Sequence, residues 1–245
     1  MNTLNSLWRI AFTTVAICVV SFLCTRSTNT VTDADGTVYT TVKIGDQVWT
    51  VENLMTTKFN DGTPIPLVTD RSEWITAGDS ARPAFCWYEN DTNNRAKYGA
   101  LYNWFAVSSG KLAPKGWHVP TDSDWTKLED YLAEKGYNWD TTKAGQTIAK
   151  AMAAKTDWAS NNGPGAVGND ISKNNQSGFS ALPGGFRIDR GDFYDSGLHG
   201  YWWSATEYDT TLVWRRALYY DKSTRIRSYG TLKKGSGFSV RLVKD

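Results

Sequence analysis

The sequence contains few cysteines, few histidines and almost no net charge. Its 245 residues include 3 Cys and 2 His, and 27 Lys and Arg are nearly balanced by 25 Asp and Glu. A net charge of +2 gives no electrostatic case for nucleic-acid binding, which usually needs a strongly basic domain, so no nucleic-acid partner is predicted. After residue 24 the remaining cysteine is Cys86, so an intramolecular disulfide framework is excluded. Cys86 lies between Phe85 and Trp87, and this apolar context predicts a buried structural thiol, with a reactive nucleophile as the alternative. His118 and His199 lie far apart with no cysteine at ligand spacing, so we predict no metal site of the zinc type.

Long hydrophobic runs are missing after residue 24, which excludes a protein with several membrane spans. Residues 1–24 carry one charged side chain, Arg9, followed by an apolar run of 15 residues that ends at Cys24. A helix of that length spans about 22 Å, less than the roughly 30 Å of a bilayer core. The pattern predicts a secretory signal peptide, with an uncleaved anchor as the alternative.

Cys24 is followed at once by a polar stretch, which resembles a bacterial lipoprotein signal in which this cysteine becomes the lipidated first residue. Small residues are expected just before such a cysteine, and Ser21-Phe22-Leu23 departs from that pattern. A plain signal peptide cleaved nearby is therefore the alternative. We predict an exported protein at the outer membrane or cell surface, in contact with a membrane through a lipid anchor alone.

The rest of the chain shows no internal repeat and no strong linker. Residues 25–35 are small and polar, as expected of a tether, and residues 36–245 are interpreted as one domain. Two alternating segments, 38–44 and 47–51, flank Gly45-Asp46 and predict a β-hairpin. Residues 121–136 predict a helix capped by Thr121, and residues 143–155 predict a second one.

Residues 158–177 form a turn-rich stretch with many Asn and Gly, which predicts a long loop. Short strands are predicted after it, within 179–182, 201–204, 212–220 and 238–243. Because helices come early and strands late, with no βαβ alternation, the order of elements predicts an α+β fold with an antiparallel sheet.

Six separated motifs resemble the Fibrobacter succinogenes major paralogous domain family of exported bacterial proteins. They cover 43–54 (KIGDQVWTVENL), 98–104 (YGALYNW), 116–125 (GWHVPTDSDW), 178–187 (GFSALPGGFR), 201–206 (YWWSAT) and 237–243 (GFSVRLV). The resemblance implies a secreted or lipoprotein context and no known reaction. Most motif residues are glycines and aromatics, whose expected task is packing and turn formation.

A second resemblance is to the C-type-lectin-like fold, in which two helices flank an antiparallel sheet and a long loop region leads into ligand-binding strands. The segment from Val119 to Trp125 is also similar to the matching helix start in formylglycine-generating enzymes. The resemblance implies a C-type-lectin-like domain over residues 36–245. Formylglycine-generating oxidases need a pair of active-site cysteines, so that activity is not expected from Cys86 alone.

No other reaction is strongly indicated, and no cofactor is predicted. The sequence shows no pattern of a base and an orienting group, which nucleophilic catalysis by Ser or Cys would require. Asp33 and Asp35 resemble a fragment of a calcium loop without its downstream acids, so a structural calcium ion stays an alternative. The lectin motifs Glu-Pro-Asn and Gln-Pro-Asp, which bind sugar through calcium, are absent.

Aromatic residues are abundant, with 12 Trp, 12 Tyr and 9 Phe, and many lie in the last quarter of the chain. Adjacent strand residues face opposite sides of a sheet, so Trp202 and Trp203 cannot both be core residues of a sheet buried on one face. Either both faces of the sheet are covered or one ring is presented outward, where it can stack on a sugar or anchor a partner. The predicted ligand-binding residues are Tyr194, Trp202, Trp203, Tyr208, Trp214 and Arg215.

The predicted function is a non-catalytic binding or adhesion module of the cell surface. Its ligand would be an extracellular polysaccharide or a surface protein, held by the late strands and the Asn/Gly loop. The alternatives are a glycan-active enzyme that uses Asp189, Asp192 or Asp195, and a purely structural surface protein.

Overall fold

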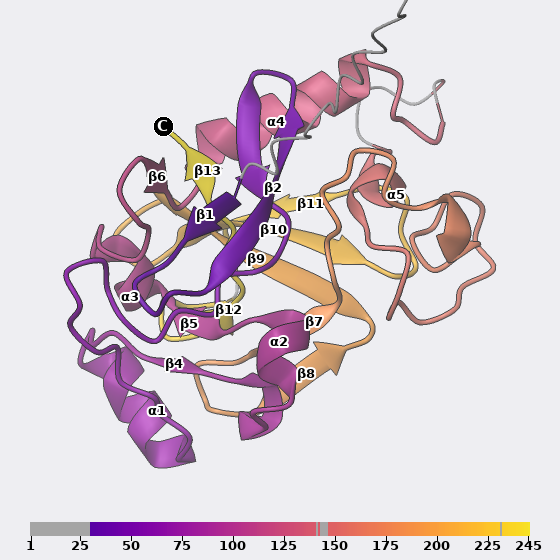
Figure 1. The fold of residues 1–245 in the computed structure, drawn as a ribbon. Helices are drawn as coiled ribbons and strands as arrows, with labels where there is room; N and C mark the ends of the chain where they lie inside the picture. The colour runs from indigo at the N-terminus through magenta and orange to yellow at the C-terminus, as the bar shows by residue number, and fades with distance from the viewer. Residues whose placement is uncertain (1–29, 141, 143–146, 231) are drawn as a thin grey trace, which may run out of the picture.

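The structure is a computed structural model that describes residues 30–140, 142, 147–230 and 232–245. It contains two β-sheets, one of five strands and one of eight, with short helices around them (Figure 1). The five-stranded sheet has the order β1 (Thr30–Thr32), β2 (Val38–Ile44), β3 (Gln47–Thr50), β13 (Val243–Lys244) and β6 (Trp117–His118).

The eight-stranded sheet is mostly antiparallel, with a parallel contact between β7 and β9. Its order is β11 (Ile226–Ser228), β10 (Val213–Tyr219), β9 (His199–Glu207), β7 (Gly184–Arg187), β12 (Gly237–Phe238), β5 (Leu101–Asn103) and β4 (Phe85–Cys86), and β8 (Phe193–Ser196) pairs with β7. The helical segments are α1 (Arg71–Asp79), η1 (Tyr88–Asn90), α2 (Asn94–Tyr98), α3 (Trp104–Ser108), α4 (Asp122–Glu134), α5 (Ala149–Met152) and η2 (Ile171–Lys173).

Two predicted elements are present where local signals placed them. Strands β2 and β3 form the predicted hairpin, and Gly45 takes the positive φ of +62° that its tight turn requires. Helix α4 begins after Thr121, whose hydroxyl accepts a hydrogen bond from the backbone N–H of Asp124. The Asp124 carboxylate accepts in return from the backbone N–H of Thr121, which completes a capping box.

The predicted α+β, C-type-lectin-like fold with two flanking helices is wrong. The structure is β-rich and built on two sheets, and among the described residues α4 alone is longer than nine residues. Within the second predicted helix, 143–155, the described helical part is α5 with four residues, while 143–146 lie outside the description. The chain leaves the helix at Ala153, which is extended, because the next residue, Ala154, donates its N–H to the carbonyl of Ala181. Long-range pairing therefore overrides the local helical pattern.

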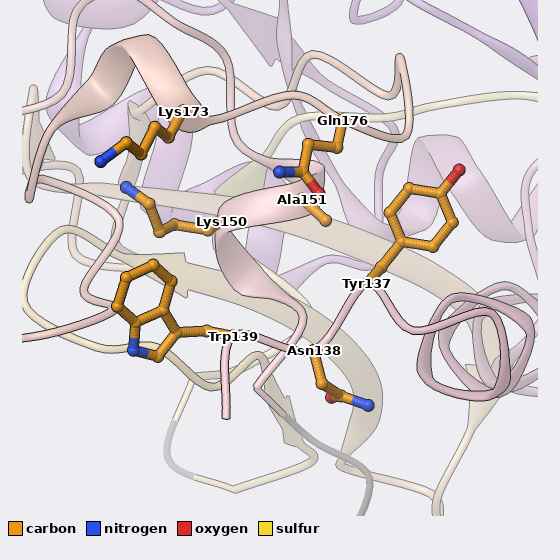
Figure 2. A pocket seen from close by; sticks show the side chains of 7 residues that line it. All are labelled: Tyr137, Asn138, Trp139, Lys150, Ala151, Lys173 and Gln176. Carbon is orange, nitrogen blue, oxygen red and sulfur yellow. The ribbon is translucent and has the colours of Figure 1, made fainter. Parts of the chain in front are cut away.

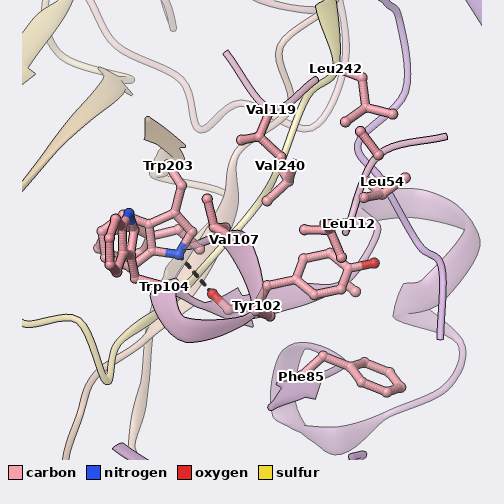
Figure 3. Close-up of a cluster of buried hydrophobic side chains, with 14 of the residues drawn as sticks. Leu54, Phe85, Tyr102, Trp104, Val107, Leu112, Val119, Trp203, Val240 and Leu242 are labelled. Atoms are coloured by element: carbon pink, nitrogen blue, oxygen red, sulfur yellow. Dashed lines mark hydrogen bonds between the residues drawn. The ribbon is translucent and has the colours of Figure 1, made fainter. Parts of the chain in front are cut away.

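Large aromatic side chains fill the core. Trp49, Trp125 and Phe179 pack together, with centroid distances of 4.9 Å between the two Trp rings and 5.7 Å from Trp49 to Phe179. Cys86 is buried and free, and burial raises the pKa of its thiol to about 12, which agrees with the predicted structural thiol. The Trp203 ring lies 4.2 Å from that of Phe238 in another cluster of buried side chains (Figure 3).

The N-terminal predictions fall mostly outside the described residues. The predicted signal peptide, residues 1–24 with Cys24, is outside the described residues, and so are residues 25–29 of the predicted tether. Residues Thr30–Thr32, which were assigned to the tether, form β1 and pair with β2, so this part of the segment belongs to the folded domain. No helix within the described parts of the chain is both long and apolar enough to cross a membrane.

Candidate functional site

Trp202 and Trp203 are both buried, so the structure shows the alternative in which both faces of the strand are covered. Their prediction as ligand-binding residues is wrong, because neither ring is accessible to a ligand. Trp203 packs in one cluster and donates from Nε1 to the carbonyl of Tyr102 at 2.7 Å (Figure 3). Trp202 packs on the opposite face of β9 in a second cluster, and its Nε1 donates to Asn53 Oδ1 at 2.9 Å. The two rings do face opposite sides, as the strand period requires, but protein covers both faces.

Arg215 is also unsuited to first contact with a ligand. It is 6% exposed, and its guanidinium donates from Nη1 to the carbonyl of Gly230. Burial lowers the pKa of Arg215, with the nearby Tyr219 and Tyr201 acting in the opposite direction. The side chain therefore supports the segment that follows β11 from beneath.

An exposed group of aromatic rings lies at the β10–β11 edge of the eight-stranded sheet. Tyr208 and Tyr229 stack face to face, with centroids 3.7 Å apart and planes inclined by 7°. Trp214 meets both rings edge-on, at 5.4 Å from Tyr208 and 4.8 Å from Tyr229. Tyr208 is 47% exposed and Tyr229 is 38% exposed. We call these three residues the edge aromatic cluster.

Strand register and a tight turn assemble this cluster. Trp214 lies on β10, and Tyr229 directly follows Ser228, which pairs with Arg215 across the β10–β11 ladder. Tyr208 comes from the turn between β9 and β10. The carboxylate of Asp209 holds that turn by accepting from the N–H groups of Thr211 and Leu212 at 2.7 and 2.8 Å, and these hydrogen bonds lower the pKa of Asp209.

Charged groups beside the cluster are paired with one another. Arg227 lies 3.9 Å from the centre of the Trp214 ring and makes two hydrogen bonds to Asp122, at 3.0 and 2.7 Å. Arg216 also binds Asp122, and burial of the carboxyl group is outweighed by these two arginines, so the pKa of Asp122 is lowered. The salt bridges fix the Arg227 guanidinium against one face of Trp214. Glu129 binds Arg216 and Arg225 as well, so three arginines face two carboxylates and each guanidinium of the group has an acidic partner within the protein.

Tyr194 is as exposed as Tyr208, at 47%, but the structure does not bring it to the cluster. It lies on β8 and packs against Phe186, with β7 and β9 between it and β10 in the sheet. Of the predicted ligand-binding residues, the structure therefore brings Tyr208 and Trp214 together, and it adds Tyr229, which was not predicted. Tyr229 could be identified only by knowing which strand pairs with the strand of Trp214, and no local sequence pattern gives that pairing.

The three acids of the alternative enzyme hypothesis have separate partners. Asp189 pairs with Lys233 at 3.1 Å, and Asp192 pairs with Arg71 at 2.9 Å. Asp195 lies 2.8 Å from His199 Nδ1 and accepts from the Tyr201 hydroxyl at 2.9 Å. No two of them share an ion-pair partner, so the arrangement gives no support to a catalytic pair of carboxylates.

The carboxylate oxygens of the suggested calcium fragment already bind other groups of the protein. Asp33 accepts hydrogen bonds from the N–H groups of Asp35 and Thr37, both at 2.9 Å. Asp35 accepts from the Thr57 hydroxyl at 2.9 Å and pairs with Lys58 at 3.4 Å. These oxygens serve the turn before β2. Among the described residues, no group of three or more His, Cys, Asp or Glu is arranged to hold a metal ion.

A small pocket of about 120 Å³ lies where the Asn/Gly loop meets α5 (Figure 2). Lys150 and Lys173 both line it, beside the exposed ring of Trp139. The Lys150 ammonium donates to the backbone carbonyls of residues 166, 169 and 170, and burial lowers its pKa. Its protons are thereby engaged in holding the loop, which makes Lys150 a structural residue.

The family comparison matches a model named Fibrobacter succinogenes major domain over residues 42–244. The chain belongs to this family. No match was found among curated proteins or among solved structures.

The family motifs meet at a buried polar network. Asn53, from the first motif, accepts on Oδ1 from Trp202 Nε1 at 2.9 Å and from Arg241 Nε at 2.7 Å. Arg241, from the last motif, also donates to the backbone carbonyls of Thr50, Val51, Phe179 and Ser180. These motif residues of the Fibrobacter succinogenes major domain therefore join distant segments of the fold. The edge aromatic cluster, at 208, 214 and 229, lies outside all six motifs.

Proposed function

We propose that this protein is a non-catalytic cell-surface module that binds a polysaccharide through the edge aromatic cluster. The observation that carries the proposal is the exposed stack of Tyr208 and Tyr229, supported from the side by Trp214. Aromatic rings at a surface present a large apolar area together with a polar hydroxyl. A pyranose ring has the matching chemistry, with an apolar C–H face and a polar rim.

The cluster is suited to binding because its rings are held before a ligand arrives. Mutual stacking, the Asp209 turn and the salt-bridged Arg227 fix the orientation of the side chains. A ligand that docks on fixed rings loses less side-chain entropy than one that must order them. Chain polymers also favour such a site, because neighbouring sugars add weak contacts to one another.

The test is a depletion assay with the exported form of the protein and a panel of insoluble polysaccharides, namely cellulose, xylan, mannan and chitin. We expect saturable binding to at least one of them without release of soluble sugar. Tyr208→Ala should weaken that binding about tenfold or more, whereas Tyr194→Ala, which removes an equally exposed tyrosine, should leave it unchanged.

Three results would count against the proposal. Release of reducing sugar would favour the enzyme hypothesis, and binding that appears only with host or neighbouring-cell proteins would favour a protein ligand. Equal binding by wild type and Tyr208→Ala would show that the cluster is not the site.

Export and anchoring are part of the same proposal. We infer that residues 1–24 direct secretion and that Cys24 is acylated, which would place the binding domain at the cell surface. The support is the signal-like sequence and the polar residues that follow Cys24.

A further inference from the structure

A cavity of about 450 Å³ lies beside the turn that presents Tyr208. Helices α1 and α3, the turns between β7 and β8 and between β9 and β10, and the loop before β12 contribute its walls. Ile75, Phe105 and Leu212 supply apolar lining, and Asp79, Asp189 and Lys233 supply charged groups. Its volume falls within the range of about 300–1,000 Å³ that is typical of small-ligand sites.

The cavity and the edge aromatic cluster share one structural element. Tyr208, at the start of the turn, joins the cluster, and Leu212, at its end, lines the cavity. The backbone N–H of Tyr208 donates to the carbonyl of Leu212 at 2.9 Å. Asp209 fixes the intervening residues, and Lys234 binds Glu207 and the carbonyl of Thr210 at 2.7 and 2.8 Å. A rigid turn therefore separates two neighbouring surfaces.

The charges around the cavity favour a neutral ligand that is rich in hydroxyl groups. Asp189 pairs with Lys233 at 3.1 Å, and Lys234 pairs with Glu207. The Asp79 carboxylate is exposed at the end of α1. Carboxylates accept hydrogen bonds from hydroxyl groups and ammonium groups donate to them, while the apolar side chains suit the C–H face of a sugar. Asp79 and Asp189 balance Lys233 and Lys234 in the lining, so the cavity presents no net charge that would attract a ligand carrying carboxylate or sulfate.

We propose that this cavity is a second subsite for the same polysaccharide, and that the protein selects a neutral glycan chain crossing the β9–β10 turn. One sugar stacks on Tyr208, and a sugar further along the chain enters the cavity against Phe105 and Leu212. This inference rests on the proposed function and adds the charge class of the ligand and its direction across the surface. Affinity should rise with chain length until both subsites are filled.

The experiment is calorimetric titration of the exported protein with cello-, xylo- and manno-oligosaccharides, from the monosaccharide to the octasaccharide. We expect affinity to rise at least tenfold between the shortest ligand that binds and the longest. Phe105→Ala should remove that rise while leaving the affinity for the shortest ligand unchanged. Asp79→Ala, at an exposed helix position, should reduce the rise without a risk to folding.

The outcomes separate this inference from the proposed function. Binding with an affinity that does not depend on length, or a full rise in both variants, would overturn the second subsite and leave the cluster as the binding site. Equal or tighter binding of oligogalacturonides would overturn the neutral class. Absence of binding by every oligosaccharide and every polysaccharide of the panel would contradict the proposed function itself.

Discussion

Arg241 is a fully buried cation whose partners are all uncharged. Burial lowers the pKa of its guanidinium to about 9, and Glu52 opposes this shift. Five carbonyl or amide oxygens from two segments, 50–53 and 179–180, accept its hydrogen bonds. Planar, five-donor geometry is what allows one side chain to satisfy all of them.

Arg241→Lys should therefore destabilise the protein. An ammonium group has three donors and cannot reach five acceptors, and each buried oxygen left without a partner costs about 1–3 kcal/mol. We expect a loss of at least about 2 kcal/mol in the free energy of unfolding, measured by urea denaturation. Arg190→Lys, at an exposed position, is the matched control and should be neutral. Equal stability of the two variants would contradict the conclusion that the hydrogen bonds of Arg241 stabilise the fold.

Trp203→Ala should act on stability and not only on binding. Its ring is fully buried, packs 4.2 Å from Phe238 and donates to Tyr102, so truncation leaves a cavity and an unpaired carbonyl. Large-to-small core changes of this kind cost about 3–5 kcal/mol. Tyr208→Ala should change the midpoint of thermal unfolding far less. A Trp203→Ala protein as stable as Tyr208→Ala would contradict the assignment of Trp203 to the core.

At the residue scale, the sequence predicted the buried thiol of Cys86 and the opposite orientation of Trp202 and Trp203. It could not tell that both faces of β9 are covered, because that depends on segments far away in the chain. Tyr102 and Asn53, the hydrogen-bond partners of the two indoles, lie about 100 and 149 residues before them. Burial of a strand residue is a tertiary property, whereas its direction is a local one.

At the scale of elements, helix α4 owes much of its stability to residues that are close to one another in the sequence. Its capping box couples Thr121 to Asp124, and His118 adds a contact at 3.1 Å. Burial of Asp124 would raise its pKa, but hydrogen bonds from Thr121 and His118 outweigh burial, so its pKa is lowered. A carboxyl group with a depressed pKa stabilises the fold above its ordinary pKa, and that contribution is lost as the pH falls through the lowered value.

Thr121→Ala should cost about 1 kcal/mol at neutral pH. The cost should shrink in strong acid, where Asp124 is protonated and no longer accepts from Thr121 as a carboxylate. Urea denaturation at neutral pH and well below the ordinary pKa of Asp gives the two values. Ser123→Ala, which removes an exposed hydroxyl from the same turn, is the control. The same cost for Thr121→Ala at both pH values would argue against the coupling.

The contrast between α4 and α5 shows what the sequence could predict at this scale. Helix α4 has a cap, an apolar face of Trp125, Leu128 and Leu132, and a glycine after its end, so its position followed from local signals. The segment around α5 has suitable apolar spacing, but its chain turns to pair with Ala181. Most strands of the large sheet are two to four residues long, too short to show a clear period.

The whole molecule is organised around two sheets with aromatic clusters packed against them. Residues of the family motifs connect segments that are distant in the sequence. Motif residues Trp202 and Arg241 both donate a hydrogen bond to Asn53, although Asn53 lies near the beginning of the domain and the two donors lie near its end. Family membership could therefore be predicted from the sequence, since the motifs are packing signals with fixed order. The fold class could not, because helix and strand order did not show that one predicted helix is short and that two sheets form.

The proposed export and anchoring can be tested at the N-terminus. Acylation at Cys24 predicts that the native protein lacks residues 1–23 and carries diacyl or triacyl mass on its first residue. Intact-protein mass spectrometry of the membrane fraction measures this directly. A Cys24→Ser protein should be found in the soluble exported fraction. An unmodified N-terminus elsewhere would indicate a plain signal peptide.

The most direct test of the binding surface is hydroxyl-radical footprinting of the protein with and without a bound polysaccharide from the panel. We expect the oxidation of Tyr208 and Tyr229 to fall when the polysaccharide is bound, while the equally exposed Tyr194 stays as reactive as before. Protection of Tyr194 with unchanged reactivity of Tyr208 and Tyr229 would contradict the central claim.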